Sequence, residues 1–290
     1  MTPRVAHAVD DVYAVDPELM GTPGALTLYL VDTPAPALVD TGSANSPPRI
    51  LEALEEVGVA PAAVEHVLVT HVHLDHGGGA GALAESLPNA TFHVHERGFP
   101  YLTDPEKLSR LKRSVDRAMG LEDAYGDPEL LPADRCRVVS GGERVDLGDR
   151  ELRLIDAPGH APHHFAALDP ATDGLFAIDA AGMFLAGEMR PTTPPPDFDL
   201  EANLETVRRL RALEPSVTFY GHVGPGEDAV AELDRYEAML PEWVETVADR
   251  RDRLGDDVDA IVEALDGRWM SPTVGRDVAG VLDYLDRTDE

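Results

Sequence analysis

The sequence predicts a mixed α/β fold in which two β-sheets lie between outer helices, rather than one doubly wound parallel sheet. Three observations lead to this prediction. Hairpin patterns occur in the same chain as strand–helix units, and this mixture is typical of two packed sheets. The 290 residues are 43% hydrophobic, which supports one large core with an appendage. The C-terminal part of the chain shows helical spacing of its apolar residues throughout.

Strands and helices alternate through the first hundred residues. Apolar runs bounded by turn residues predict the strands, and a Pro-containing turn joins the first two. The helix after them has Ser46 as its N-cap, Pro47 at its first position and Gly58 at its end. The expected elements are strands at 24–31, 36–40, 64–71 and 90–95, and helices at 47–57 and 79–88.

The middle of the chain predicts two hairpins, over 143–160 and 163–180. Their tips are expected at Gly148-Asp149 and at Asp173-Gly174, which are dipeptides that favour tight turns. A helix follows at 200–213, with apolar residues at helical spacing and a charged opposite face. The segment 216–222 is a last short strand.

Residues 96–135 depart from this alternation. The segment is charged and mostly helical in pattern, so we interpret it as an insertion over one edge of the functional site. Its aromatic residues Phe99, Tyr101 and Tyr125 could form a pocket wall. A mobile lid or plain surface helices are the alternatives.

Residues 227–290 also differ from the strand–helix alternation of the main part of the chain. Helical spacing continues through them and is interrupted at Pro241, Gly255 and Gly267. We therefore expect a main domain over 1–226 and a helical C-terminal extension packed against it.

The charge is strongly negative, with 54 acidic and 24 basic residues and a formal net charge of −30. Such a surface repels polyanions, so nucleic-acid binding is not expected. The acidic residues are spread along the chain, which argues against an interaction tail. Only two of the basic residues are lysines. This composition is typical of halophile proteins, for which concentrated salt screens the self-repulsion; an ordinary acidic enzyme from a GC-rich genome is the alternative.

The sequence predicts a cytoplasmic protein. No run approaches the roughly 18 to 20 apolar residues of a membrane helix. Aspartates interrupt the N-terminal stretch where a signal peptide needs an apolar run. The single cysteine, Cys136, cannot form an internal disulfide, as expected in a reducing compartment.

The run "THVHLDHGGG" carries the chemistry. It places His71, His73, Asp75 and His76 in a glycine-rich loop after an apolar strand. Side chains at this spacing cannot all point one way from a regular strand or helix, but they can converge from a loop. Imidazole and carboxylate ligands suit zinc, iron or manganese. A structural role for this cluster is hard to find, so we predict a metal site.

Further candidate ligands follow three later strands. His160 ends "LIDAPGH", Asp179 ends an apolar run and His222 ends "VTFYGH". Taken singly, a strand-end histidine is more often structural and a strand-end aspartate is more often a turn or cap residue. Taken together with the loop, they give five histidines and two aspartates. That is the count for two metals that share a bridging carboxylate and a hydroxide.

The ordered motifs "THVHLDHGGG", "APGH", "AIDAAG" and "YGH" resemble those of the metallo-β-lactamase-fold hydrolases. The resemblance covers about residues 10–225 and implies a four-layer αββα sandwich. It implies two metal sites that are joined by Asp179 as the bridging ligand. The implied ligands are His71, His73 and His160 for site one, and Asp75, His76 and His222 for site two.

The resemblance also extends to "LVDTG". It implies that Asp40 lies behind the metals and orients a ligand; a turn or capping aspartate is the alternative. His163 and His164, in "GHAPHHF", are candidates for a general acid, for supporting contacts on the substrate side of the site, or for packing beneath it. We expect Asp75, His76 and Asp179 to serve catalysis as well as metal binding.

The ligand pattern is shared by glyoxalase II-type thioesterases, lactonases and RNase Z-type phosphodiesterases. True β-lactamases of this fold usually have Cys where this chain has Asp179. The acidic C-terminal helices lack the basic residues with which glyoxalase II holds glutathione. The expected function is therefore hydrolysis of a small acyl substrate, a thioester, ester or lactone, by a metal-bridging hydroxide. The alternatives are a mononuclear-iron persulfide dioxygenase and an RNase Z-type phosphodiesterase.

The expected cofactors are two divalent metal ions. Zinc is the expected metal, with iron or manganese as alternatives. The expected partner is a small-molecule substrate, with no nucleic acid and no membrane, and a homodimer is left open.

Overall fold

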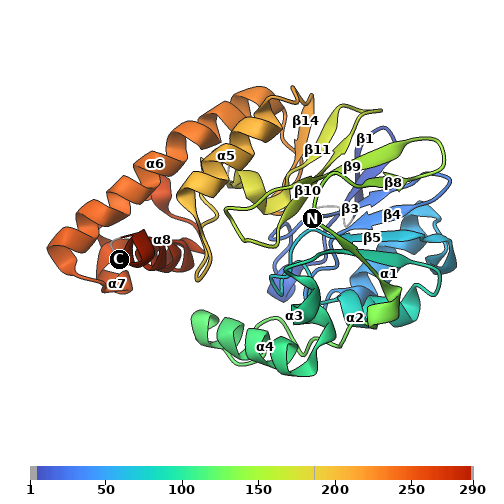
Figure 1. Ribbon diagram of the computed structural model, residues 1–290, viewed down its shortest axis with the longest axis horizontal. Coiled ribbons are helices and arrows are strands. Elements are labelled where there is room, and N and C mark those ends of the chain that lie inside the picture. Colours follow the sequence, from blue (N-terminus) through green and yellow to red (C-terminus); the bar gives the residue numbers. More distant parts are fainter. Residues whose placement is uncertain (1–4, 186, 289–290) are drawn as a thin grey trace.

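The computed structural model describes residues 5–185 and 187–288. Its elements form four layers, in which two β-sheets face each other and helices cover the outer face of each sheet (Figure 1). This αββα arrangement confirms the predicted fold class and excludes a single doubly wound sheet.

The first sheet has seven strands in the order β1-β2-β3-β4-β5-β6-β7. Neighbours from β1 to β4 run antiparallel, whereas β4 to β7 run parallel. Parallel strands end at the same edge of a sheet, so the loops after β4, β5 and β6 lie side by side there. The strands are β1 (Val5–Val9), β2 (Val12–Val15), β3 (Leu28–Val31), β4 (Ala37–Val39), β5 (His66–Val69), β6 (Thr91–His95) and β7 (Cys136–Val139).

The second sheet has five strands in the order β14-β11-β10-β9-β8. Its two hairpins confirm the predictions over 143–160 and 163–180, although the second turn lies just before Gly174 rather than on it. A separate small hairpin pairs two further strands, which the sequence did not indicate. The strands are β8 (Arg144–Asp146), β9 (Glu151–Asp156), β10 (Phe165–Asp169), β11 (Gly174–Phe176), β12 (Met183–Leu185), β13 (Glu188–Arg190) and β14 (Val217–Phe219).

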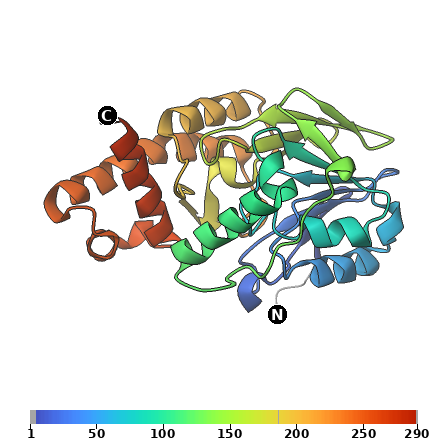
Figure 2. The same ribbon diagram turned by 60° about the horizontal axis from the view of Figure 1, so that its bottom comes forward.

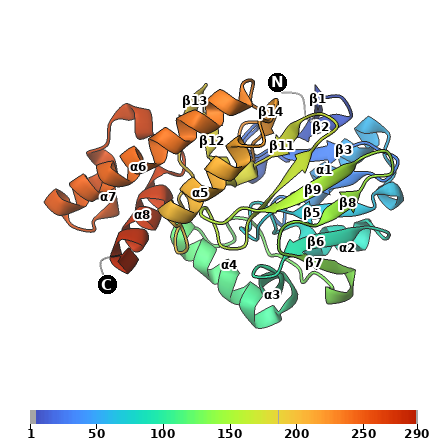
Figure 3. The same ribbon diagram turned by 45° about the horizontal axis from the view of Figure 1, so that its top comes forward.

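Helices cover the two sheets from opposite sides. One hydrophobic core joins α1 to α4 to the first sheet, and another joins α5 to α8 to the second sheet and to each other. Figures 2 and 3 show α4 extending from α3 toward α8, so the insertion approaches the C-terminal helices. The helices are α1 (Pro47–Val57), α2 (Ala80–Ser86), α3 (Phe99–Thr103), α4 (Pro105–Met119), α5 (Leu200–Arg211), α6 (Ala229–Leu254), α7 (Val258–Glu263) and α8 (Val274–Thr288).

A third core lies between the sheets and contains three aromatic residues in mutual contact. The rings of Phe176 and Phe219 are 4.4 Å apart, and Tyr29 lies 5.0 Å from Phe219. All three are fully buried, and each ring contributes about 2 to 3 kcal/mol by leaving water. The Tyr29 hydroxyl donates to the carbonyl oxygen of Tyr220 at 2.7 Å. This contact fixes the end of β14, from which His222 follows.

Two local predictions need correction. Ser46 precedes α1, but its hydroxyl accepts a hydrogen bond from the amide of Ser43 at 3.0 Å instead of capping the helix. Pro241 does not interrupt the C-terminal pattern, because α6 runs through it. The proline removes one backbone donor, but Trp243 beside it is fully buried and holds the helix in place.

The predicted end of that helix at Gly255 is confirmed. The C-terminal helices share their core with the second sheet, and the division of the chain at residues 226 and 227 stays a prediction. No helix in the described ranges is both long and apolar enough to span a bilayer.

Candidate metal centre

The histidine-rich loop follows β5 and folds tightly on itself. The amides of His76 and Gly77 donate to the His73 carbonyl oxygen at 2.9 and 2.7 Å. The next glycines have no room for a side chain. A Cβ on Gly78 would lie 2.3 Å from the Leu74 carbonyl oxygen, and one on Gly79 would lie 2.3 Å from that of Thr41. The glycines therefore let the loop pack against the backbone beside it before α2 begins.

The first cluster of the site contains His71, His73 and His160. One nitrogen from each ring lies within 4.8 Å of the other two. His160 Nε2 is 3.0 Å from His73 Nδ1. His160 comes from the segment after β9, so the cluster joins the loop of the first sheet to the second sheet.

The second cluster contains Asp75, His76 and His222, with ligand atoms again within 4.8 Å of one another. Asp179 lies between the two clusters, in a single turn of 3-10 helix after β11. Its Oδ2 is 3.4 Å from His76 Nε2, 3.5 Å from His222 Nε2 and 3.6 Å from His160 Nε2. One carboxylate oxygen thus faces histidines of both clusters.

Unpartnered buried atoms are consistent with a metal site between these side chains. Within the described residues, His71 Nε2, His76 Nε2 and Asp179 Oδ1 are buried without a hydrogen-bond partner. Each such atom costs about 1 to 3 kcal/mol when it is left unsatisfied. These atoms belong to residues that also line the two clusters, so a divalent ion in each would satisfy them. The donor set therefore fits the metal site that is typical of this fold.

The protonation states of the first cluster and of Asp179 suit metal binding. Burial among other imidazoles lowers the pKa of His71 and His73 well below its usual value. Both rings are therefore neutral near pH 7, which is the form that binds a metal. Burial alone would raise the pKa of Asp179, but the charges of His76 and His222 hold it well below its usual value. The carboxylate between the clusters stays ionised.

Three of the histidines are oriented by their Nδ1 atoms. The Nδ1 of His76 lies 2.9 Å from Asp40 Oδ2, that of His160 lies 2.9 Å from the Thr192 carbonyl oxygen, and that of His222 lies 2.7 Å from the Ala25 carbonyl oxygen. These oxygens can only accept, so Nδ1 carries a proton, and Nε2 is the nitrogen that is left to bind a metal when the ring is neutral. Such partners fix the tautomer of a metal-binding histidine.

Asp40 is held behind the histidines by Thr70. Its Oδ1 accepts from the Thr70 amide at 2.9 Å and from the Thr70 hydroxyl at 2.8 Å. The Thr70 hydroxyl in turn lies 3.1 Å from His71 Nδ1. Asp40 also lies within 4.8 Å of ligand atoms of His71 and His76. Its oxygens already accept these hydrogen bonds, which is the contact pattern expected for the predicted orienting role.

The two histidines after His160 lie in different places. His163 lines the cavity, and its Nδ1 accepts from the Val72 amide at 3.4 Å. His164 is fully buried and stacks on His71 with 4.8 Å between ring centroids. Among the described residues, those that line the cavity do not include His164. Of the alternatives left open, His164 packs beneath the site and only His163 can face a substrate.

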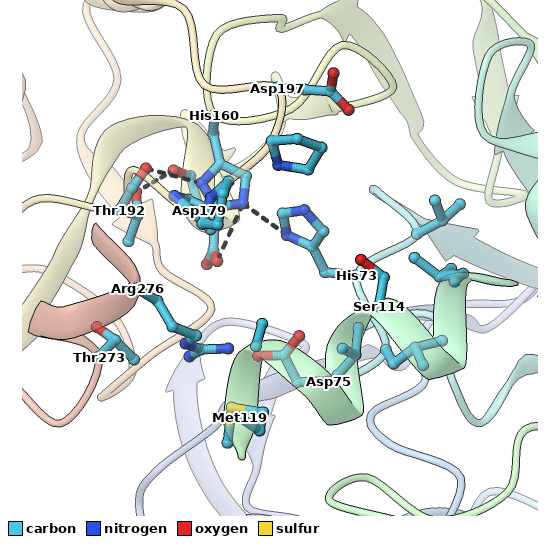
Figure 4. Close-up of a pocket in the computed structure, with 18 of the residues that line it drawn as sticks. His73, Asp75, Ser114, Met119, His160, Asp179, Thr192, Asp197, Thr273 and Arg276 are labelled. Atoms are coloured by element: carbon cyan, nitrogen blue, oxygen red, sulfur yellow. Dashed lines mark hydrogen bonds and ion pairs between the residues drawn. The ribbon is translucent and has the colours of Figure 1, made fainter. Parts of the chain in front are cut away.

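A cavity of about 420 Å³ opens over the two clusters (Figure 4). The proposed ligands form one side, which we call the metal end. The other side, which we call the helical wall, comes from α4, from the N-terminal part of α8 and from the residue just before α8. Tyr101 and Tyr125 line the cavity as the sequence indicated, whereas Phe99 packs against the core instead. The wall includes Leu111, Ser114, Val115, Met119, Thr273 and Arg276.

Comparisons with known proteins agree with this architecture. A family model described as the metallo-beta-lactamase superfamily matches residues 21–222. The metallo-beta-lactamase fold-containing protein ST1585 of Sulfurisphaera tokodaii is 36% identical over 190 residues, which cover 64% of this chain and 70% of the relative. An N-acyl homoserine lactonase of Bacillus cereus is 24% identical over 234 residues, covering 69% and 84%.

A solved structure has a similar fold. The crystal structure of the archaeal protein ST1585 has a TM-score of 0.69 and 25% identity, and the match covers 95% of this chain and 100% of that chain. The family model spans every candidate ligand from His71 to His222. The chain therefore belongs to the metallo-beta-lactamase superfamily, as a metal-dependent hydrolase of that fold.

Proposed function

We propose that the chain is a dinuclear metal hydrolase of a small acyl substrate, a thioester, ester or lactone, with zinc as its metal. The position of Asp179 carries this proposal. A single oxygen of this carboxylate lies 3.4 to 3.6 Å from histidine nitrogens that belong to both clusters. A mononuclear site would not need a second buried cluster of one aspartate and two histidines.

The chemistry of the pair follows from its ligands. Two divalent ions held in these clusters would supply a nucleophilic hydroxide at neutral pH and would polarise the scissile carbonyl. Asp179 sets the separation of the clusters, and Asp75 and His76 hold the second cluster against the loop. The Nδ1 contacts keep the rings fixed, so the protein does not have to reorganise as charge develops.

The cavity favours acyl substrates over nucleic acids. Much of its helical wall is apolar, which suits a short acyl chain. A thiol leaves with a pKa near 8.5 and needs no strong acid, whereas an alkoxide from RNA is far more basic. A tRNA also needs a basic surface, and the formal net charge of −30 opposes one. The similarity to N-acyl homoserine lactonases of Bacillus supports an acyl substrate and favours a lactone among the three candidates.

Hydrolysis assays combined with a metal count test this proposal. A simple acyl thioester, a lactone and an activated phosphodiester are offered to protein whose metal content has been measured. We expect two metals per chain and chelator-sensitive hydrolysis of an acyl substrate. Turnover of the phosphodiester alone would favour the RNase Z type of activity. One iron per chain without any hydrolysis would favour the persulfide dioxygenase.

We also propose that the protein works in concentrated salt. Its acidic residues repel one another at low ionic strength, and molar salt shortens the screening length to about 3 Å. The urea concentration at the midpoint of unfolding should therefore rise between 0.1 and about 2 M KCl. An unchanged midpoint would indicate an ordinary acidic enzyme instead.

A further inference from the structure

Arg276 brings a positive charge into the cavity from α8. The side chain is half-buried and belongs to the helical wall. Its Nη1 donates to the Tyr125 hydroxyl at 3.3 Å. Figure 4 shows the guanidinium pointing from α8 into the space beside Asp75. A residue of the C-terminal helices therefore reaches the metal end of the site.

This arginine has no acidic partner in the part of the chain that is described. No carboxylate oxygen of residues 5–185 or 187–288 lies within 4.0 Å of its guanidinium, whereas Arg208, Arg211 and Arg268 each form such a pair. The neighbouring Asp277 is already occupied, because it accepts from the Thr193 amide and the Thr273 hydroxyl at 2.7 Å each. In a chain with 54 acidic residues, an unpaired arginine in a cavity is available for an anion from outside.

The surroundings of Arg276 set where that anion would lie. The Tyr125 hydroxyl donates to Asp75 Oδ2 at 3.5 Å. Two hydrogen bonds through Tyr125 therefore connect Arg276 to Asp75 of the second cluster. Two other lining carboxylates, Asp197 and Asp283, are exposed, and Figure 4 shows Asp197 across the cavity from Arg276. The cavity is thus polarised, with its enclosed positive charge close to the metal end.

We propose that Arg276, supported by Tyr125, binds a carboxylate group of the substrate other than the group that is hydrolysed. The preferred substrates are then small esters, thioesters or lactones that carry a free carboxylate a few bonds from the scissile carbonyl. This inference rests on the proposed acyl-hydrolase function and narrows its substrate class.

The chemistry of the two side chains supports this choice. A guanidinium has five donors in a planar fork that matches a carboxylate. Tyr125 donates its own proton to Asp75 Oδ2 and accepts from Arg276 Nη1, so its oxygen holds the fork in position. The other cation in the described lining, Arg110, is exposed on α4, where water weakens its attraction for an anion. Arg276 is therefore the specificity-determining residue.

A matched pair of substrates tests this inference. A five-membered lactone that carries a ring carboxylate is compared with the same lactone carrying a carboxamide, using zinc-loaded protein. Loss of one charge-assisted hydrogen-bonded pair changes affinity about 10- to 100-fold. We expect the wild type to prefer the carboxylate by this factor in kcat/KM, mainly through KM. Arg276→Gln should remove the preference, and Arg276→Lys should keep part of it.

The control is Arg253→Gln, which changes an exposed arginine near the end of α6, outside the cavity lining. It should leave both substrates unaffected. An equal fall in kcat for both lactones in Arg276→Gln, with the preference unchanged, would overturn the inference, because the arginine would then act on the reacting group. The same holds if the wild type shows no preference for the carboxylate.

A binding measurement separates this inference from the proposed function. Glutarate and its monoamide are titrated into the zinc-loaded wild type and Arg276→Gln by calorimetry. If neither lactone is hydrolysed, the proposed function is in doubt, but Arg276 is still tested. A roughly tenfold preference for glutarate that Arg276→Gln abolishes supports the inference. Equal preferences in both proteins would refute it.

Discussion

The two sides of the cavity are held in different ways. At the metal end, His76, His160 and His222 each have a second nitrogen fixed by an oxygen at 2.7 to 2.9 Å. The helical wall presents long, half-buried side chains such as Met119 and Arg276. Rigid placement suits metal binding and catalysis, whereas an adjustable wall suits substrate selection. We therefore expect that substitutions at the metal end and substitutions in the helical wall have separable effects on activity.

The largest effect should come from Asp179, at the centre of the metal end. Asp179→Ala removes the charge that faces both clusters, so at least one metal should be lost. We expect kcat to fall by roughly 100-fold or more, together with a lower metal content. Both are measured on the same preparation. Full activity with two metals in this variant would show that the carboxylate does not bridge them.

The next effect should come from Asp40. Asp40→Ala leaves the Thr70 hydroxyl and His76 Nδ1 without their buried acceptor, so His76 is no longer held in orientation. Losing such a supporting contact typically lowers metal affinity about 10- to 100-fold. Chelator competition measures the affinity, and activity should recover when metal is added in excess. If excess metal restores nothing, Asp40 does more than orient its neighbour.

Asp277 links α8 to Thr193, in the segment that orients His160. Its ionisation should make the free energy of unfolding depend on pH. Burial raises its pKa to about 6, above the unfolded value of about 3.9. The folded state therefore binds more protons between these values, and this carboxyl destabilises the fold as the pH rises from about 4 to 6. Above pH 6 the ionised carboxyl lowers the free energy of unfolding by about 3 kcal/mol. Asp277→Asn should raise Tm at pH 7 and lose this advantage near pH 4.

Thr193→Ala serves as a comparison for that experiment, because it removes the hydroxyl that donates to the Asp277 carbonyl oxygen while keeping the carboxyl group. Its loss of Tm should be similar at both pH values. A lower Tm for Asp277→Asn than for the wild type at pH 7 would mean that the ionised form is needed for the contacts to Thr193 and Thr273.

The smallest effect should come from the apolar part of the helical wall. Met119→Ala removes contact equivalent to one or two methylene groups, so KM for a long acyl chain should rise roughly 4- to 15-fold. The metal content and kcat for an acetyl substrate should not change. Ser114→Ala is a matched change on the same helix that removes little surface. A loss of metal in Met119→Ala would show that the two sides are not separable.

The metal end could be predicted because several of its candidate ligands lie close together in the sequence. His71, His73, Asp75 and His76 lie within six positions, and the glycines after them indicate a tight loop. The later ligands each follow an apolar strand, so their meeting could be inferred once two sheets were expected. The four-layer fold itself came from the resemblance, since hairpins and strand–helix units alone indicate only that two sheets are present.

The helical wall was less predictable because its contacts are distant in sequence. Arg276 and Tyr125 are 151 residues apart, and neither belongs to a motif. Thr70 precedes the histidines directly, but its bond to Asp40 depends on the pairing of β4 with β5. The edge strands β1 and β7, and β2 beside β1, were missed because they are short and partly exposed. Burial of Trp243 similarly outweighed the helix-breaking tendency of Pro241.

The hydrogen bond between Asp277 and the Thr193 amide has a consequence for synthesis on the ribosome. The carbonyl oxygen of Thr192, directly before that amide, orients His160. Because α8 is translated after His222, every proposed ligand exists several seconds before the helix that anchors this segment. Until α8 has folded, the carbonyl that orients His160 has no anchor and the helical wall is missing. The first cluster and the substrate pocket should therefore reach their final geometry together, at the end of synthesis.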